Sequence, residues 1–290
     1  MKNWRSCVSL ALLAIFAMAA QPGLAQKKAK PVKSLRVYLF DCGMIKGSDP
    51  APYHVKLEDL YLKSSDMVVP CYLIVHPKGT LMWDVGLIPD SAFKGGNGPV
   101  VINRPGATTI SSPKPLLPQL AAIGYRPEDI TYLALSHYHF DHVANANAFA
   151  GSTWLVHATE REAMFAVPPE RQTAYDQLKN SKTVILPNTD YDVFGDGTVV
   201  IKYAPGHTPG HQVLFLKLPK TGPVLIAGDL WHYPQERSAT EAPRGDPDKP
   251  ATMASRAAME AYLKQSGAQL WIEHDVANFN RLQKAPAYIQ

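Results

Sequence analysis

The residues with the clearest chemical potential lie between His137 and His142, where the chain reads His-Tyr-His-Phe-Asp-His. Four side chains able to bind a metal ion fall within these six residues, between an apolar strand and a predicted helix. Because side chains alternate along a strand, His137 and His139 are expected to project to the same side. The turn into the helix brings Asp141 and His142 to a neighbouring point, so one short segment is able to hold two metal ions. Imidazole and carboxylate together suit zinc and similar divalent ions.

Three further segments offer polar side chains directly after strands or in rigid turns. His207 lies in the stretch Pro-Gly-His-Thr-Pro-Gly-His from 205 to 211, whose prolines and glycines predict a rigid turn. Asp229 follows an apolar strand in Ala-Gly-Asp, and His274 follows the strand predicted at 270–272. Loops at strand ends are able to converge on one edge of a pair of sheets, so we expect these side chains to meet there. A carboxylate at Asp229 is able to bridge two cations. His211 and His157 are interpreted as structural residues.

The elements that must position these residues are predicted from hydrophobic patterning. Strands are predicted at 35–40, 68–75, 80–84, 130–135, 153–156, 183–186, 198–203, 212–218, 224–227 and 270–272, and helices at 115–123, 141–149, from 158 onwards and at 251–265. Residues 43–66 are expected to be irregular. Residues 86–112 are rich in glycine and proline and predict a long loop, either a binding loop or a surface insertion. Strand runs with helices between them favour an α/β fold of two sheets packed face to face.

Residues 1–25 are predicted to be a secretory signal peptide. An apolar run follows two basic residues and ends before small residues at Gly23-Leu24-Ala25 that a signal peptidase is able to recognise. This run of about 13 residues is shorter than the ~20 that span a bilayer, so no membrane anchor is expected after cleavage. Residues 26–34 are then expected to form a basic linker and residues 35–290 a single domain, in a periplasmic or secreted protein.

Charge and cysteine content limit the expected partners and covalent links. The chain of 290 residues has 29 basic and 25 acidic residues, a net charge of +4. Cleavage after residue 25 removes two basic residues and leaves a net charge of +2, so no nucleic acid partner is expected. Cys42 and Cys71 remain in the mature chain. Export permits a disulfide between them, but their apolar, strand-like surroundings are typical of free buried thiols, which we favour.

The segments 136–142, 205–211 and Gly228-Asp229 resemble the metallo-β-lactamase superfamily, over about residues 35 to 285. Within it the chain is most similar to the N-acyl-homoserine lactonase family. The resemblance implies an αββα sandwich of two mixed β-sheets flanked by helices, with two divalent metal ions, by default zinc, at one edge. It implies that one ion is held by His137, His139 and His207, that the other is held by Asp141, His142 and His274, and that Asp229 bridges them. It also implies that Asp84 hydrogen-bonds a ligand histidine and fixes its ring.

The implied reaction is opening of the lactone ring of N-acyl-homoserine lactones, a quorum-quenching activity on a small-molecule substrate. A metal-bridging hydroxide would attack, and Asp141 would pass a proton to the leaving alkoxide. Penicillin-type hydrolases of this fold generally lack the carboxylate at Asp229, so its presence favours the lactonase, glyoxalase and phosphotriesterase-like branches. Several lactonases carry a tyrosine three residues after the bridging aspartate, where this chain has His232. We expect His232 or Tyr233 to contact the substrate instead, with packing as the alternative role.

Two other functions stay open at this level. A phosphotriester or aryl ester hydrolase would use the same ligands, and the pocket shaped by residues 43–66 and 86–112 would decide between the substrates. A non-catalytic periplasmic metal-binding protein would have a closed site of four ligands, whereas seven ligands for two ions leave an open position. Iron, cobalt and manganese fit the same ligands as zinc. A homodimer is compatible with it, since dimers occur among similar enzymes.

Overall fold

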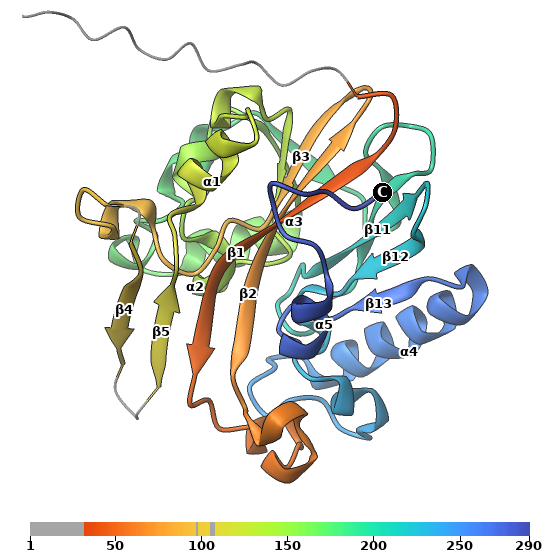
Figure 1. Ribbon diagram of the computed structural model, residues 1–290. Coiled ribbons are helices and arrows are strands. Elements are labelled where there is room, and N and C mark those ends of the chain that lie inside the picture. The colour runs from red at the N-terminus through yellow and green to blue at the C-terminus, as the bar shows by residue number, and fades with distance from the viewer. Residues whose placement is uncertain (1–31, 97, 105–107) are drawn as a thin grey trace, which may run out of the picture.

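The protein is an αββα sandwich, seen here in a computed structural model that describes residues 32–96, 98–104 and 108–290 (Figure 1). The predicted signal peptide and most of the basic linker lie outside the described residues. Two β-sheets pack face to face, with α1, α2 and α3 on the side of the larger sheet and α4 on the side of the smaller one. None of the helices among the described residues has the length and apolar character needed to cross a membrane.

The larger sheet has eight strands in the order β4-β5-β1-β2-β3-β6-β7-β8. Its strands are β1 Arg36–Lys46, β2 Met67–His76, β3 Gly79–Trp83, β4 Val100–Asn103, β5 Thr109–Ser112, β6 Tyr132–Ala134, β7 Thr153–His157 and β8 Thr183–Leu186. The pairs from β3 through β6 and β7 to β8 are parallel, and the other pairs are antiparallel. Because parallel strands end at the same edge, the segments that follow β3, β6 and β7 start side by side.

The smaller sheet has five strands in the order β13-β12-β11-β10-β9. They are β9 Tyr191–Asp192, β10 Val199–Tyr203, β11 Gln212–Leu218, β12 Gly222–Ile226 and β13 Gln269–Trp271. β12 and β13 are parallel, so the chain leaves both strands at the same edge. Asp229 and His274 follow these two strands and are thereby brought together.

The helices are α1 Leu116–Ala122, α2 Phe140–Val143, α3 Ala158–Ala166, α4 Lys249–Ser266 and α5 Val276–Arg281. The longest helix, α4, begins where the Asp248 side chain accepts a hydrogen bond from the Ala251 N–H and ends at Gly267 in the left-handed region. It packs Met259 and Leu263 on the outer face of the smaller sheet. Alternate residues of β11 face the other way, into the core between the sheets.

Several regions differ from the sequence prediction. The segment 86–112 contains the hairpin of β4 and β5 at the edge of the larger sheet (Figure 1), where a structureless loop was expected. Most of β4 is exposed, so it lacks the apolar alternation that marks a strand. The helix predicted at 141–149 ends at Val143 and continues only as a 3-10 turn from Ala146 to Phe149. Helix α5 was not predicted, because six residues are too few to show a helical period.

Cys42 and Cys71 form a disulfide, so the preference for free thiols was wrong. They lie on β1 and β2, which are antiparallel neighbours, and β1 has an irregularity between Asp41 and Met44. Their Cα atoms are 5.9 Å apart, within the range that a disulfide spans. The pairing depends on strand register, which apolar patterning alone does not determine.

Candidate metal centre

The side chains predicted to bind metal come together at the edge where strands of both sheets end. Their ligand atoms form two groups, and within each group these atoms lie within 4.8 Å of one another. The first group is His137, His139, His207 and Asp229, and the second is Asp141, His142, Asp229 and His274. The structure thus brings together every predicted ligand and places Asp229 in both groups.

Asp229 lies between the two groups with one oxygen towards each. Its Oδ2 is 3.5 Å from His137 Nε2 and 3.4 Å from His207 Nε2. Its Oδ1 is 3.2 Å from His142 Nε2 and 3.1 Å from His274 Nε2. Burial alone would raise the pKa of Asp229, but the surrounding histidines, His274 and His142 foremost, hold it well below its usual range. An ionised carboxylate that faces both groups has the geometry of a bridging ligand.

Several of these ligand atoms have no hydrogen-bond partner. Among the described residues, His137 Nε2, His142 Nε2 and Asp229 Oδ1 are buried and make no hydrogen bond, although they lie close to one another. Leaving buried polar atoms unpaired costs free energy, and here the atoms point to a common centre. Imidazole nitrogens and carboxylate oxygens are donors that suit divalent transition ions. The residues present therefore fit two divalent metal ions.

Buried partners hold four of the five ligand histidines by Nδ1, so that each turns Nε2 towards the centre. The partners are Asp84 Oδ2 for His142 at 2.8 Å, Val68 O for His274 at 2.8 Å, Asp246 Oδ1 for His207 at 3.0 Å and Ser136 Oγ for His137 at 3.0 Å. Such outer contacts fix the orientation and tautomer of metal-binding histidines. His139 is the exception, since its Nδ1 faces His207 Nε2 at 3.0 Å.

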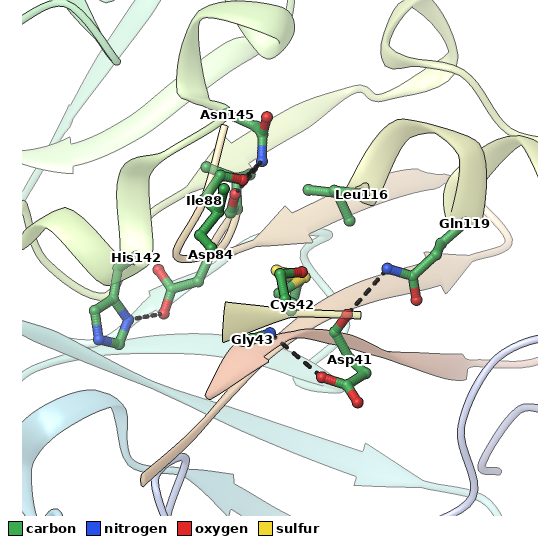
Figure 2. Close-up of a disulfide and its surroundings, with 12 residues drawn as sticks. Asp41, Cys42, Gly43, Asp84, Ile88, Leu116, Gln119, His142 and Asn145 are labelled. Atoms are coloured by element: carbon green, nitrogen blue, oxygen red, sulfur yellow. Dashed lines mark hydrogen bonds and ion pairs between the residues drawn. A yellow bond between two sulfur atoms is a disulfide. The ribbon is translucent and has the colours of Figure 1, made fainter. Parts of the chain in front are cut away.

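Asp84 makes the hydrogen bond to a ligand histidine that the resemblance implied. It directly follows β3 in the left-handed region, with φ of 53°, and its second oxygen accepts the Ser136 N–H at 2.6 Å. The next residue donates its N–H to the carbonyl of His142 at 2.8 Å. Figure 2 shows the hydrogen bond between Asp84 and His142, together with the disulfide at Cys42. The Cys42–Cys71 disulfide packs against Gly86 of the same turn, where an added Cβ would lie 3.1 Å from Cys42 Cβ. The turn is thus held between the disulfide and the metal-binding segment.

The His211 ring hydrogen-bonds the backbone of Asp229 and helps to hold Asp229 in place. The Asp229 N–H donates to His211 Nε2 at 3.0 Å, so the other ring nitrogen carries the proton and donates to the carbonyl of Ala204 at 3.0 Å. Burial lowers the pKa of His211 to about 3, with His207 adding to the effect, which agrees with a neutral ring. Gly228 allows this close approach, because a Cβ there would lie 2.6 Å from His211 Nε2 and its φ is +52°.

A cavity of about 410 Å³ adjoins the two ligand groups. Tyr53, Arg104 and Phe140, the first residue of α2, line it, and the Arg104 guanidinium lies 4.3 Å from the centre of the Phe140 ring. His232 also lines the cavity, with Nε2 3.3 Å from Asp229 Oδ2. The Tyr53 ring lies against His232, with centroids 4.3 Å apart. The cavity therefore has residues of the two ligand groups as its floor, and Tyr53, Arg104 and Phe140 form part of its wall.

Tyr233, the other residue predicted to contact the substrate, is not among the residues that line this cavity. Its hydroxyl donates to the carbonyl of Ser65 at 2.9 Å, and it faces a neighbouring hollow. Tyr53 faces the ligand groups instead, and sequence reasoning missed it. It lies in the irregular segment 43–66 without a motif, so its only signal was an aromatic residue in a polar, turn-rich stretch.

Comparison with known proteins agrees with this architecture. A family model described as the metallo-beta-lactamase superfamily matches residues 65–267. An N-acyl homoserine lactonase from Bacillus sp is 31% identical over 232 residues, which cover 77% of this chain and 88% of the relative. Another, from Azorhizobium caulinodans, is 27% identical over 271 residues, which cover 88% of this chain and 98% of the relative.

Solved structures show the same fold. An N-acyl homoserine lactone hydrolase with N-hexanoyl-L-homoserine at its catalytic metal centre has a TM-score of 0.70 and 24% identity, covering 89% of this chain and 100% of its own. A dizinc quorum-quenching lactonase has a TM-score of 0.60 and 18% identity, covering 91% of this chain and 97% of its own. The predicted αββα sandwich is confirmed. The chain belongs to the metallo-beta-lactamase superfamily and is a metal-dependent hydrolase.

Proposed function

We propose that this protein opens the lactone ring of N-acyl homoserine lactones with two divalent metal ions. The observation that carries the proposal is the position of Asp229, whose two oxygens face two ligand groups at the floor of a cavity. The names of the curated relatives, which match over 77% to 88% of this chain, support the substrate class. We propose zinc as the metal, because five imidazoles with two carboxylates suit it.

Ring opening requires a proton transfer to the leaving oxygen, and a residue of this chain is placed to perform it. When bound, the two ions would supply a hydroxide nucleophile near neutral pH and polarise the lactone carbonyl. Ring opening produces an alkoxide, which needs a proton. Asp141 lines the cavity, and its Oδ2 lies 3.6 Å from Nε2 of both His142 and His274. We assign to the Asp141 carboxylate the relay of that proton: it would take up the proton that the hydroxide brings and pass it to the leaving oxygen, and would itself end ionised as it began.

Substrate contacts are assigned to residues that line the cavity above Asp229. His232 Nε2 and the Tyr53 ring lie together beside the first ligand group, where they are able to meet the polar part of a lactone. Ile45, Met67 and Phe140 supply apolar surface for an acyl chain. The assignment keeps His232 as a substrate contact and gives Tyr53 the place that was considered for Tyr233.

We also propose that the protein is exported to the periplasm or beyond. The sequence of residues 1–25 motivates this proposal. The Cys42–Cys71 disulfide supports it, because disulfides persist in oxidising compartments and are rare in the cytosol. Cleavage is tested by N-terminal sequencing of the protein recovered from a bacterial periplasm, which should begin near residue 26.

The reaction is tested by titration at constant pH. The zinc-loaded protein is mixed with a long-chain N-acyl homoserine lactone, and the base consumed is recorded, because ring opening produces an acid. Turnover that stops when a chelator removes the metal, and that Asp229→Asn lacks, is the expected result. A fully metallated protein that leaves the lactone intact but cleaves an aryl ester or a phosphotriester would overturn the lactone assignment.

A further inference from the structure

Glu160 is a buried carboxylate next to the metal centre that belongs to neither ligand group. It lies in the first turn of α3 and is 3% exposed. Its Oε1 accepts the Tyr138 N–H at 2.9 Å, and its Oε2 accepts the Gly210 N–H at 2.8 Å. The Thr208 hydroxyl lies 2.9 Å from Oε1 and 2.7 Å from Oε2. Both carboxylate oxygens are thus engaged by donors.

These donors come from two segments that carry the first ligand group. Tyr138 stands between His137 and His139, and Thr208 directly follows His207. One carboxylate therefore joins the segment after β6 to the turn before β11, and all three histidines of the first group lie next to its donors. Among the described residues, the hydrogen-bond partners of Glu160 are Tyr138, Thr208 and Gly210, and none of them is adjacent to His274, the histidine that follows β13 and belongs to the second group.

The contact between α3 and the turn 205–211 is close and specific. A Cβ on Gly210 would lie 2.6 Å from the backbone nitrogen of Glu160, so a larger residue would push the turn away. The Thr159 hydroxyl adds a hydrogen bond to the carbonyl of Pro209 at 3.0 Å. An ionised carboxylate only accepts hydrogen bonds, and every polar partner of Glu160 here is a donor. Burial raises the pKa of Glu160 to about 7, while the hydrogen bonds from Thr208 and from two backbone amides oppose the rise.

We propose that Glu160 is a positioning residue for one of the two metal ions. It holds the His137–His139 segment and the His207 turn at the spacing at which their three imidazoles bind the same ion. Asp84 is the corresponding positioning residue for the second group, because its carboxylate hydrogen-bonds His142 Nδ1. The proposal rests on the two-ion site of the proposed function and is independent of the substrate.

The first test is Glu160→Gln in the zinc-loaded full chain. Glutamine keeps the size but has one acceptor oxygen, so it cannot accept from both Tyr138 and Gly210, and its amide opposes a donor. We expect the affinity for one zinc ion to fall about 10- to 100-fold, the usual effect of losing an outer partner of a ligand. The affinity for the other ion should stay within about threefold. The matched control is Glu162→Gln, an exposed glutamate on the same helix, which should leave both affinities unchanged.

The second test identifies which ion is affected. Zinc affinities are measured by competition with a chelator for Glu160→Gln, Asp84→Asn and the double variant. If the two residues act on different ions, each single variant keeps one tight ion and the double variant keeps none. A double variant that still binds one ion as tightly as the single variants would overturn the assignment to separate groups.

A purely structural role for Glu160 gives a different result. In that case Glu160→Gln lowers the melting temperature of the metal-free protein but leaves both zinc affinities unchanged, and the proposal is wrong. If Glu160→Gln does not fold, Thr208→Val replaces it, because both backbone hydrogen bonds of Glu160 remain. Thr208→Val should weaken the same ion about threefold to tenfold, and unchanged affinities would overturn the proposal. These measurements use no lactone, so failure of the proposed reaction does not affect them.

Discussion

The floor and the wall of the cavity are built differently. The floor consists of the ligand groups, whose side chains are buried apart from His139 and are held by buried partners. The wall includes Arg104 and Phe140, which are exposed, and the half-buried Tyr53. Four of the five floor histidines are hydrogen-bonded by buried partners, whereas Phe140 is 45% exposed and has the Arg104 guanidinium over its ring. We infer that the floor determines the class of reaction, and that the more exposed side chains of the wall determine which substrate enters.

Asp229→Asn tests the floor most severely. It removes the charge that faces both ligand groups, so metal content and turnover should fall together by more than about 100-fold, beyond the loss expected for an outer partner. Metal analysis and base consumption at constant pH measure the two effects. Full activity with both ions retained would contradict a bridging role and remove the distinction between floor and wall at this residue.

His232→Ala tests the border between floor and wall. His232 is 3.3 Å from Asp229 but belongs to neither ligand group, so metal content should be unchanged. Loss of a hydrogen bond to a substrate whose charge develops during the reaction should lower kcat about 10- to 100-fold. Steady-state kinetics on several lactones and esters measure this. Unchanged rates for every substrate would assign His232 to packing alone.

Tyr53→Phe tests the wall by removing a single hydroxyl group. If that hydroxyl contacts the lactone, kcat/KM should fall about fivefold to tenfold, the effect of one neutral hydrogen bond. Both metal ions should remain bound. Tyr61→Phe is the matched control, because Tyr61 lies in the same segment and is 49% exposed. Equal kinetics for the two variants would show that Tyr53 serves only to pack against His232.

His157→Asn has the smallest expected effect. It tests a buried histidine at the end of β7 that belongs to neither ligand group. Burial lowers the pKa of His157 to about 4, against 6.5 for an unperturbed histidine. The unfolded chain therefore binds the proton more readily, and stability that is fully present above pH 6.5 is lost as the pH falls towards 4. The melting temperature of the metal-free variant should fall less between pH 7 and 5 than that of the parent protein. Parallel curves would show that His157 is not held neutral.

Much of the fold prediction came from patterns of residues that are neighbours in the sequence. The strands β2 and β3 and the helix α4 were recognisable because apolar runs, a turn at Pro77-Lys78-Gly79 and a glycine stop are properties of neighbouring residues. The hairpin of β4 and β5 was not recognisable, because its outer strand is exposed and its partner β1 lies far away in the chain. Strand pairing of this kind follows from packing, which short windows of sequence do not contain.

In the candidate site, too, some features were predictable from the sequence and others appeared only in the tertiary structure. The sequence alone determined a dense set of candidate ligands, because the chemistry and spacing within His137–His142 are local. It also pointed to His207, Asp229 and His274 by their positions in a rigid turn or after strands, and the family resemblance assigned each residue to an ion. Their role as ligands stays a prediction. Only the tertiary structure decided that Cys42 bonds Cys71, that Tyr53 rather than Tyr233 lies in the cavity, and that Glu160 joins two ligand segments. The physical reason is that such contacts depend on the register and packing of segments far apart in the chain.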